Sequence, residues 1–195
     1  MITAESVARH FIFLASRMEE PTPLTHMQVQ KLVYYAQGWS LAHLKRPLFR
    51  DRLEAWTHGP VVDRVYQEFK RFGRCEIDPS AGREAESLDS DEAELIRWVW
   101  NRYNRYSAPE LRRMTHGEEP WKDAWGNRAD DDRSRVPISE TALASYFSEQ
   151  GAREANRIGL DLKAMEASTA DARAGRTTPL DLSEFRKRGD SKRAG

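Results

Sequence analysis

Histidine and carboxylate side chains are the groups in this chain whose types could perform chemistry. His26, His58 and His116, together with Glu118 and Glu119, include the donors that a metal-dependent hydrolase or an acid–base pair would use. Their spacing matches no HExxH motif, no HxH motif and no EF-hand loop. Each histidine lies near an expected helix start or end, where capping and hydrogen bonding account for it. The sequence therefore predicts no catalytic residues, no metal and no cofactor.

The remaining candidate nucleophiles lack the surroundings that would activate them. Cys75 is the single cysteine, so an internal disulfide and a cysteine-based zinc site are both excluded, and no local signature makes its thiol reactive. Ser107 and Ser139 are placed as helix caps, and no GxSxG elbow surrounds any serine. No glycine-rich phosphate loop is present either. We therefore expect a protein that is not an enzyme.

Composition limits the classes of partner. The 195 residues contain 31 basic and 31 acidic side chains, and this balance gives no general attraction to nucleic acid or to a membrane surface. The first sixteen residues include charged side chains and lack the apolar core of a signal peptide. No apolar run is long enough to span a bilayer. The expected location is the cytoplasm, without membrane or nucleic-acid partners.

The clearest element is a helix over residues 24–44. Thr25 and Gln28 have the spacing of a capping box, and Leu24 and Val29 are placed as the hydrophobic staple around it. Apolar residues then recur at three-and-four spacing, which puts them on one face. Gly38 in the middle of a helix costs about 1 kcal/mol relative to alanine. Its presence predicts that another backbone packs closely against this helix.

Further capping signals predict a mainly α fold, a bundle of about six helices with a small β-hairpin. Segments 47–49 and 53–56 flank a charged turn and are expected to form the two strands of the hairpin. The other helices are expected to begin at Thr3, Gly59–Pro60, Asp89, Ser107, Glu118 and Ser139.

A break in composition near Gly151 divides the chain into a domain over 1–150 and an extension over 151–195. All six tryptophans and all six tyrosines lie in the first part, which can bury a core. The extension is expected to be helical at first and to end in a disordered basic tail. Ile158, Leu162 and Met165 form a narrow apolar stripe there. This stripe either docks on the chain's own core or binds in the groove of a partner.

Three motifs, taken together, resemble the Panacea antitoxin domain, also described as SocA-like or phage-associated GepA-like. The first comprises KLVYYAQGWSLA at 31–42 with the following segment 47–69. The second is LIRWVWNRYNRYSAPELRRMTHGEEPWKDAW at 95–125, and the third is ISETALASYF at 138–147. The resemblance covers most of residues 5–147 and does not reach the extension.

The resemblance implies an antitoxin that neutralises a cognate protein toxin by direct binding, rather than an enzyme. It also implies an alternative, an adaptor that delivers a client toxin to a cytoplasmic protease. A hydrolase that uses His58, His116 and Glu118 is a third, less favoured alternative. The residues that match the family pattern, most of them expected to form the scaffold, are Tyr34, Tyr35, Gln37, Gly38, Trp39, Trp56, Gly59, Pro60, Val61, Tyr66, Thr115, His116, Glu118, Pro120 and Trp121.

Two groups of residues are predicted to bind the toxin. Tyrosine and tryptophan are enriched at binding hot spots, which favours Tyr34, Tyr35 and Trp56 with exposed ring edges. The second group is the stripe formed by Ile158, Leu162 and Met165. In this hypothesis, a rigid core presents aromatic anchors while the extension folds onto the toxin.

Overall fold

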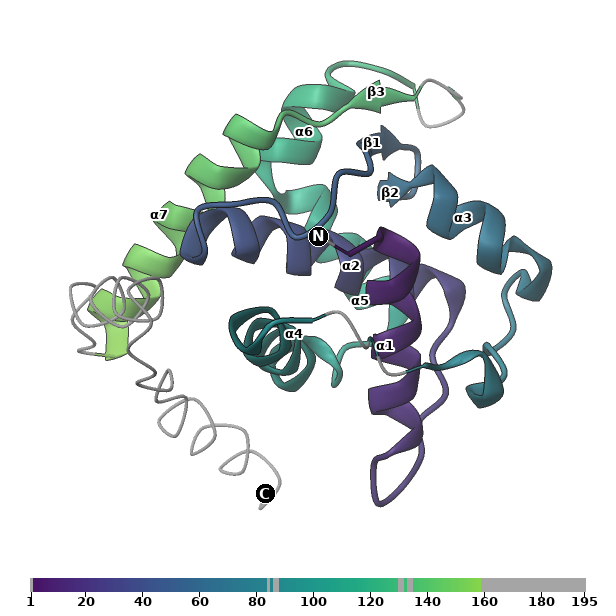
Figure 1. Ribbon diagram of the computed structural model, residues 1–195. Helices are drawn as coiled ribbons and strands as arrows, with labels where there is room; N and C mark the ends of the chain where they lie inside the picture. The colour runs from purple at the N-terminus through teal and green to yellow at the C-terminus, as the bar shows by residue number, and fades with distance from the viewer. Residues whose placement is uncertain (1, 84, 86–87, 130–131, 133–134, 159–195) are drawn as a thin grey trace, which may run out of the picture.

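A computed structural model describes residues 2–83, 85, 88–129, 132 and 135–158, with the backbone alone for 154–158. Within them the fold is mainly α, as predicted, with seven α-helices and a small antiparallel sheet (Figure 1). The elements in chain order are α1 (Ala4–Ser16), α2 (His26–His43), β1 (Leu53–Trp56), β2 (Gly59–Val62), α3 (Asp63–Phe69), η1 (Lys70–Phe72), η2 (Pro79–Ala81), α4 (Ser90–Tyr103), α5 (Ala108–Gly117), α6 (Glu119–Trp125), β3 (Val136–Pro137) and α7 (Glu140–Ile158).

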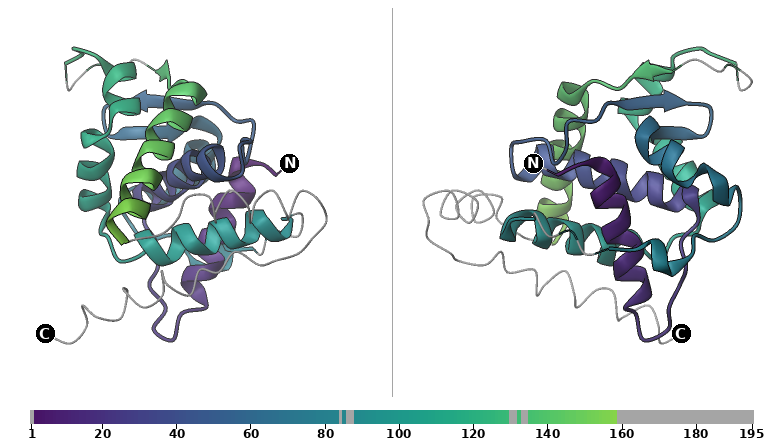
Figure 2. Two further views of the ribbon diagram at one scale, coloured as in Figure 1. Left: turned by 90° about the vertical axis from the view of Figure 1, so that its left-hand side faces the viewer. Right: turned by 45° about the vertical axis from the view of Figure 1, so that its right-hand side comes forward.

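Helix α2 lies at the centre of the molecule. It packs against α1, α4, α5, α7 and β2, and Figure 2 shows these elements surrounding it in both views. Every residue from Val29 to Ser40 is buried. The helix is therefore covered around its whole circumference, which sets it apart from an ordinary surface helix with a single apolar stripe.

The helix starts follow the capping signals in the sequence. The Thr25 amide donates to Gln28 Oε1 at 2.9 Å, and the Gln28 amide donates to Thr25 Oγ1 at 3.3 Å. The predicted capping boxes at Asp89 and Ser107 are also present, and the Thr3 hydroxyl caps α1. These predictions are confirmed because a capping box depends only on residues three positions apart.

The prediction of the hairpin was wrong in its pairing. Strand β1 pairs with β2 through a two-residue turn, and the second neighbour of β1 is β3, which gives the order β2-β1-β3. Gly59 closes this turn with φ +98°, a conformation that favours glycine. Gly59 and Pro60 therefore belong to a strand, and the helix expected to start there begins at Asp63.

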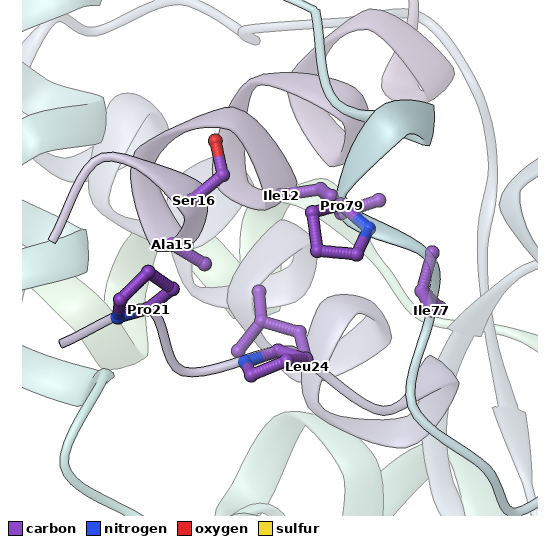
Figure 3. A pocket seen from close by; sticks show the side chains of 8 residues that line it. Ile12, Ala15, Ser16, Pro21, Leu24, Ile77 and Pro79 are labelled. Carbon is purple, nitrogen blue, oxygen red and sulfur yellow. The ribbon is translucent and has the colours of Figure 1, made fainter.

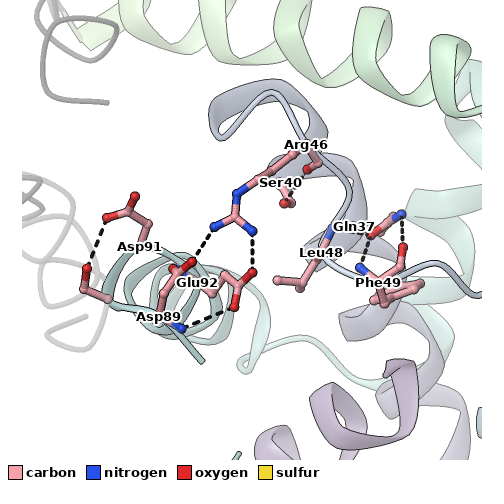
Figure 4. Close-up of polar contacts among 9 residues, drawn as sticks. Gln37, Ser40, Arg46, Leu48, Phe49, Asp89, Asp91 and Glu92 are labelled. Carbon is pink, nitrogen blue, oxygen red and sulfur yellow. Dashed lines mark hydrogen bonds and ion pairs between the residues drawn. The ribbon is translucent and has the colours of Figure 1, made fainter. Parts of the chain in front are cut away.

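Segment 47–49 is not a strand because a side chain of α2 binds its backbone. Gln37 Nε2 donates to the Phe49 carbonyl at 3.1 Å, and Gln37 Oε1 accepts from the Leu48 and Phe49 amides at 3.0 and 3.2 Å (Figure 4). These are the bonds that a neighbouring strand would otherwise supply. Leu48 and Phe49 are buried, and the segment belongs to no strand.

An ion-pair network joins the end of α2 to the start of α4. Arg46 donates to Glu92 at 2.5 Å and to Asp89 at 2.6 Å (Figure 4). Glu92 is 3% exposed and also forms part of the capping box of α4. One guanidinium therefore fixes the N-terminus of α4 relative to the loop that follows α2.

The close approach predicted at Gly38 comes from a side chain of α7. A Cβ at Gly38 would lie 2.2 Å from Phe147 Cε2, so the ring occupies the space that the glycine leaves open. The expectation of a packed backbone at this position was therefore wrong. Phe147 also contacts the rings of Tyr34 and Trp39 edge-on, at 5.6 and 5.1 Å between ring centroids.

Helix α7 runs past residue 150, where the composition changes, and its described part ends at Ile158. A Cβ at Gly151 would lie 3.5 Å from both His43 and Trp39, which is ordinary contact with the end of α2. Leu162 and Met165, the remaining residues of the predicted stripe, lie outside the described residues. The division into 1–150 and 151–195 stays a prediction.

Gly38→Ala should destabilise the protein by about 1–3 kcal/mol, because the new methyl group collides with the Phe147 ring. The measurement is urea denaturation followed by tryptophan fluorescence. Gly117→Ala is the matched control, since a Cβ there meets nothing within 4 Å. In a double-mutant cycle, Phe147→Leu should remove part of the cost of Gly38→Ala. Additive effects of the two substitutions would contradict this packing.

Candidate functional site

The first two of the three motifs that carry the family resemblance meet in one place, at a buried group of polar residues. We call it the polar cluster. Its members come from three elements and from the residue between α5 and α6: Lys31, Tyr34 and Tyr35 of α2, Gly59 and Pro60 of β2, Thr115 of α5, and Glu118. These residues are up to 87 positions apart in sequence, from Lys31 to Glu118.

Glu118 lies at the centre of the polar cluster. Its two carboxyl oxygens accept from the hydroxyls of Tyr34 and Tyr35, at 2.7 and 2.9 Å. Burial raises the pKa of Glu118 to about 7, against the opposing effect of these hydrogen bonds and of Lys31. Burial and the neighbouring carboxylate raise the pKa of both tyrosines well above the ordinary value, so the hydroxyls stay protonated as donors.

Lys31 is the second charged group of the polar cluster. Its Nζ donates to the Pro60 carbonyl at 3.0 Å, and the side chain is 1% exposed. Burial, followed by the charge of Arg112, lowers the pKa of this amine to about 7, and Glu118 acts in the opposite direction. A Cβ at Gly59 would lie 2.7 Å from this Nζ and 2.9 Å from Thr115 Oγ1. Glycine is therefore required at position 59 by space as well as by its positive φ.

Gln30, which sequence reasoning missed, completes the attachment of the sheet to α2. Its amide donates to the Val62 carbonyl at 3.2 Å and accepts from the Val62 amide at 3.0 Å. Together with Lys31, it covers the outer edge of β2, because these bonds replace those of a further strand. The signal that could have found both residues is a pair of polar side chains within a stretch that is otherwise expected to be buried.

Aromatic residues of the motifs extend the polar cluster towards the sheet. Trp121 Nε1 donates to the Trp56 carbonyl at 3.0 Å, and the ring of His116 stacks on Trp121 at 4.0 Å. Pro120 is buried in the first turn of α6, where its missing N–H has no cost. The hydrogen bond from Trp121 to Trp56 thereby joins the second motif to the hairpin that the first motif contains.

Trp56 lies where this scaffold reaches the surface. Its ring is half-buried and packs between Tyr66, at 5.0 Å between centroids, and the Arg135 guanidinium, 4.5 Å from the ring centroid. Its Nε1 donates to Glu54 at 2.9 Å. Of the six tryptophans, all within the described residues, Trp56 is the one that is not buried.

Of the three aromatic residues predicted to bind the toxin, two are buried and one, Trp56, is partly exposed. Tyr34 and Tyr35 are 0% and 1% exposed, so the expectation that their ring edges lie at the surface was wrong. Toxin contact by these two residues stays a prediction, and it would require the helices that cover them to move. Trp56 is accessible from solvent.

Most of the other motif residues lie in the interior, where a scaffold role is expected. Gln37, Gly38 and Trp39 are buried in α2, and Trp39 Nε1 donates to the Tyr103 hydroxyl at 3.0 Å. Val61 is buried in β2. Tyr66 is half-buried, and its ring lies 5.1 Å from that of His26.

The three histidines considered as metal ligands have different surroundings. His26 is buried, and burial lowers its pKa to about 4, which keeps it neutral at pH 7. His58 is exposed in the hairpin turn, and His116 packs on Trp121. No group of three or more histidine, cysteine, aspartate or glutamate side chains in the described ranges is placed to hold a metal ion. The hydrolase alternative gains no support from this arrangement.

Across the part of the chain that the structure describes, no helix combines the length and the apolar character needed to cross a bilayer.

The buried amine predicts a pH dependence that Lys31→Met should abolish. The folded state lowers the pKa of Lys31 from 10.5 to about 7, so between these values the unfolded chain binds more protons. Stability should therefore rise with pH over this window. We expect the wild type to gain on the order of 1 kcal/mol per pH unit relative to the variant between pH 7 and pH 9.5. Urea denaturation at half-unit steps measures it, and parallel curves for the two proteins would contradict it.

Comparison with known proteins identifies the family of the chain. The family model described as "Antitoxin SocA-like, Panacea domain" matches residues 29–122, a range that contains every member of the polar cluster. A curated protein of Caulobacter vibrioides (strain NA1000 / CB15N), named Antitoxin SocA, is 30% identical over 131 residues, which cover 62% of this chain and 69% of that protein. No solved structure matches the chain. The chain thus belongs to the family of SocA-like antitoxins with a Panacea domain.

Proposed function

We propose that this protein is an antitoxin that neutralises a cognate protein toxin by direct binding in the cytoplasm. The observation that carries the proposal is the 30% identity to Antitoxin SocA over 131 residues. The matched range of the family model includes the polar cluster and the hairpin, which together hold the domain in one arrangement. In this proposal, that arrangement is the scaffold on which the binding surface is displayed.

The structure favours binding over catalysis because the reactive groups of the motifs are already engaged. Both oxygens of Glu118 are bound by tyrosine hydroxyls, and Lys31 is bound to the Pro60 carbonyl. A general acid or nucleophile must be reachable by its substrate. Lys31 and Glu118 are 1% and 9% exposed. Their arrangement supports a structural role.

Trp56 is the proposed aromatic anchor of the toxin interface. Tyr66 and Arg135 hold its ring in place, so little side-chain entropy remains to be lost when a partner covers it. The Trp121 bond to residue 56 involves the backbone carbonyl and survives a change of side chain. Truncation of Trp56 is therefore a test of the surface that leaves this part of the scaffold in place.

The apolar stripe formed by Ile158, Leu162 and Met165 is the proposed second contact. Helix α7 carries the chain from the core at Phe147 to Ile158, where the described part ends. A segment that follows a well-anchored helix could cover the active surface of a toxin, and burial of each apolar side chain is worth roughly 1.5–3 kcal/mol. In this proposal, the segment neutralises the toxin by covering its active surface, and the core holds the start of the segment in place.

The test is co-expression with the toxic product of a neighbouring gene, scored by growth, beside thermal melts. Trp56→Ala and the pair Ile158→Asp with Leu162→Asp should each weaken neutralisation while the melting temperature stays within a few degrees of the wild type. Tyr106→Ala is the matched control, since Tyr106, which follows α4, is also half-buried and its ring lies 6.5 Å from that of Tyr103 between centroids. The control should neutralise normally.

Two outcomes would count against direct neutralisation. Failure of the wild type to protect cells from any neighbouring product would remove the antitoxin role. Protection that disappears in a host lacking cytoplasmic proteases would indicate delivery of the toxin for degradation, which is the adaptor alternative. Binding of purified toxin with loss of its activity, in the absence of any protease, is the result that direct neutralisation requires.

A further inference from the structure

The turn of the β1–β2 hairpin, residues 56–59, is held by side chains from outside the sheet. On one side, Trp121 Nε1 of α6 donates to the Trp56 carbonyl at 3.0 Å. On the other side, Lys31 Nζ of α2 donates to the Pro60 carbonyl at 3.0 Å. Both donors belong to buried residues. The backbone on either side of the turn is therefore bound to two different helices.

The turn has little freedom to move between these two bonds. Thr57 Oγ1 donates to the Asp132 carbonyl at 2.8 Å, which joins the turn to the segment before β3. Gly59 has φ +98°, and Lys31 Nζ lies 2.7 Å from the position that a Cβ would take there. A loop that is fixed before binding loses little conformational entropy when a partner covers it. The turn thus has the property that a preformed binding loop requires.

The turn carries the accessible tryptophan. The Trp56 ring is half-buried, Thr57 is half-buried, and His58 is exposed. Tryptophan is enriched among the residues that dominate binding energy, and such residues act from well-packed positions. Of the bonds that hold the turn, the one from Trp121 lies nearest to this anchor, because it binds the carbonyl of residue 56 itself.

The polar cluster in turn fixes Trp121. Helix α6 begins directly after Glu118, whose two carboxyl oxygens accept from Tyr34 and Tyr35 of α2. The Lys122 amide also donates to the Glu118 carbonyl at 3.1 Å, which ties the first turn of α6 to the same residue. A line of contacts therefore runs from α2 through Glu118 and Trp121 to the residue that carries the anchor.

We propose that the hairpin turn is the recognition loop of the toxin interface and that Trp121 is its positioning residue. This proposal rests on the proposed function for the toxin as partner and for Trp56 as anchor. Trp121 is buried, so its indole N–H acts through the carbonyl of residue 56. Without this N–H, the turn keeps its pairing within the sheet but loses the bond that fixes it to α6. The Trp56 ring and His58 then no longer keep one arrangement.

The first experiment measures the turn without any toxin. Trp121→Phe keeps an aromatic ring and removes the N–H. NMR of the isotopically labelled full-length chain then reports the carbonyl signal of Trp56 and the amide signals of Thr57 and His58. These signals should shift, because a carbonyl and the amide of the same peptide group both respond to the loss of a hydrogen bond. Signals that keep their wild-type positions would overturn the proposal.

Trp125→Phe is the matched control on the same helix. Trp125 is also buried, and its Nε1 also donates to a backbone carbonyl, that of Arg128 at 3.2 Å. The Trp121 and Trp125 rings stack 5.6 Å apart, so the two substitutions disturb the same region of packing. The control should leave the signals of the turn in place. Equal shifts in both variants would show that the packing of α6, rather than the bond, sets the turn, and would overturn the proposal.

A second variant keeps the test decisive if Trp121→Phe does not fold. Benzothienylalanine at position 121 has the shape of tryptophan with sulfur in place of the N–H, so the packing of α6 remains and the bond alone is lost. The signals of residues 56–58 should shift in this variant as well. Wild-type positions of these signals would contradict the positioning role.

The last experiment distinguishes failure of this inference from failure of the proposed function. The probe is the purified product of the neighbouring gene. Trp121→Phe should bind it about tenfold more weakly, because preorganisation of the anchor is lost, and Trp125→Phe should bind it like the wild type. Wild-type affinity of the Trp121 variant would overturn its positioning role, while the antitoxin function stands. Failure of the wild type to bind or neutralise the product would instead reject the proposed function, and the NMR signals would still decide whether Trp121 positions the turn.

Discussion

The structure depends on the burial of α2 on every side, which leaves its polar side chains without access to water. Gln30, Lys31 and Gln37 solve this problem in the same way, by bonding to backbone groups of neighbouring segments. A buried polar group without a partner would cost several kcal/mol, so each of these contacts is strongly favoured. The segments that they bind, 48–49 and 60–62, are held to a helix in the positions where another strand would normally bind them.

Glu118, in the second motif, is a further polar side chain that is buried against α2 and hydrogen-bonded there. A carboxylate in this place is tolerated because two hydroxyls donate to it and an amine stands nearby, and the residue between α5 and α6 is thereby fixed against α2. Lys31 and Glu118 thus tie the hairpin and the α5–α6 corner to the same helix. Each of the two groups also favours the charged form of the other, because the charge of Glu118 raises the pKa of Lys31 and the charge of Lys31 lowers that of Glu118.

Local features of the fold could be predicted from the sequence, and those that depend on distant contacts could not. The helix starts at Thr25, Asp89 and Ser107 were correctly placed, because the residues that form each cap are neighbours. The hairpin was misassigned because Gln37, from another element, takes the bonds of segment 47–49. The glycine at 38 indicated a close contact, but nothing in the sequence near it revealed that the contacting group was the Phe147 ring.

The candidate site was harder to predict for a related reason. Composition identified aromatic residues as anchors, yet exposure decides which of them can act, and exposure depends on the whole fold. Tyr34 and Tyr35 face Glu118 in the interior, whereas Trp56 reaches solvent from the edge of the hairpin turn. The small pocket between the end of α1 and the segment before η2 (Figure 3) could not be predicted at all, because Pro21 and Ile77, which both line it, lie more than fifty positions apart.

The position of Phe147 has a consequence for the order of events during synthesis. Helix α7 is the last helix that the structure describes, yet its phenylalanine fills the gap over Gly38 near the start of the chain. While the ribosome is still translating the residues before 147, α2 has been made but lacks part of its cover. The nascent chain therefore exposes apolar surface of its central helix until synthesis is well advanced, and the domain can complete its core only after α7 has emerged.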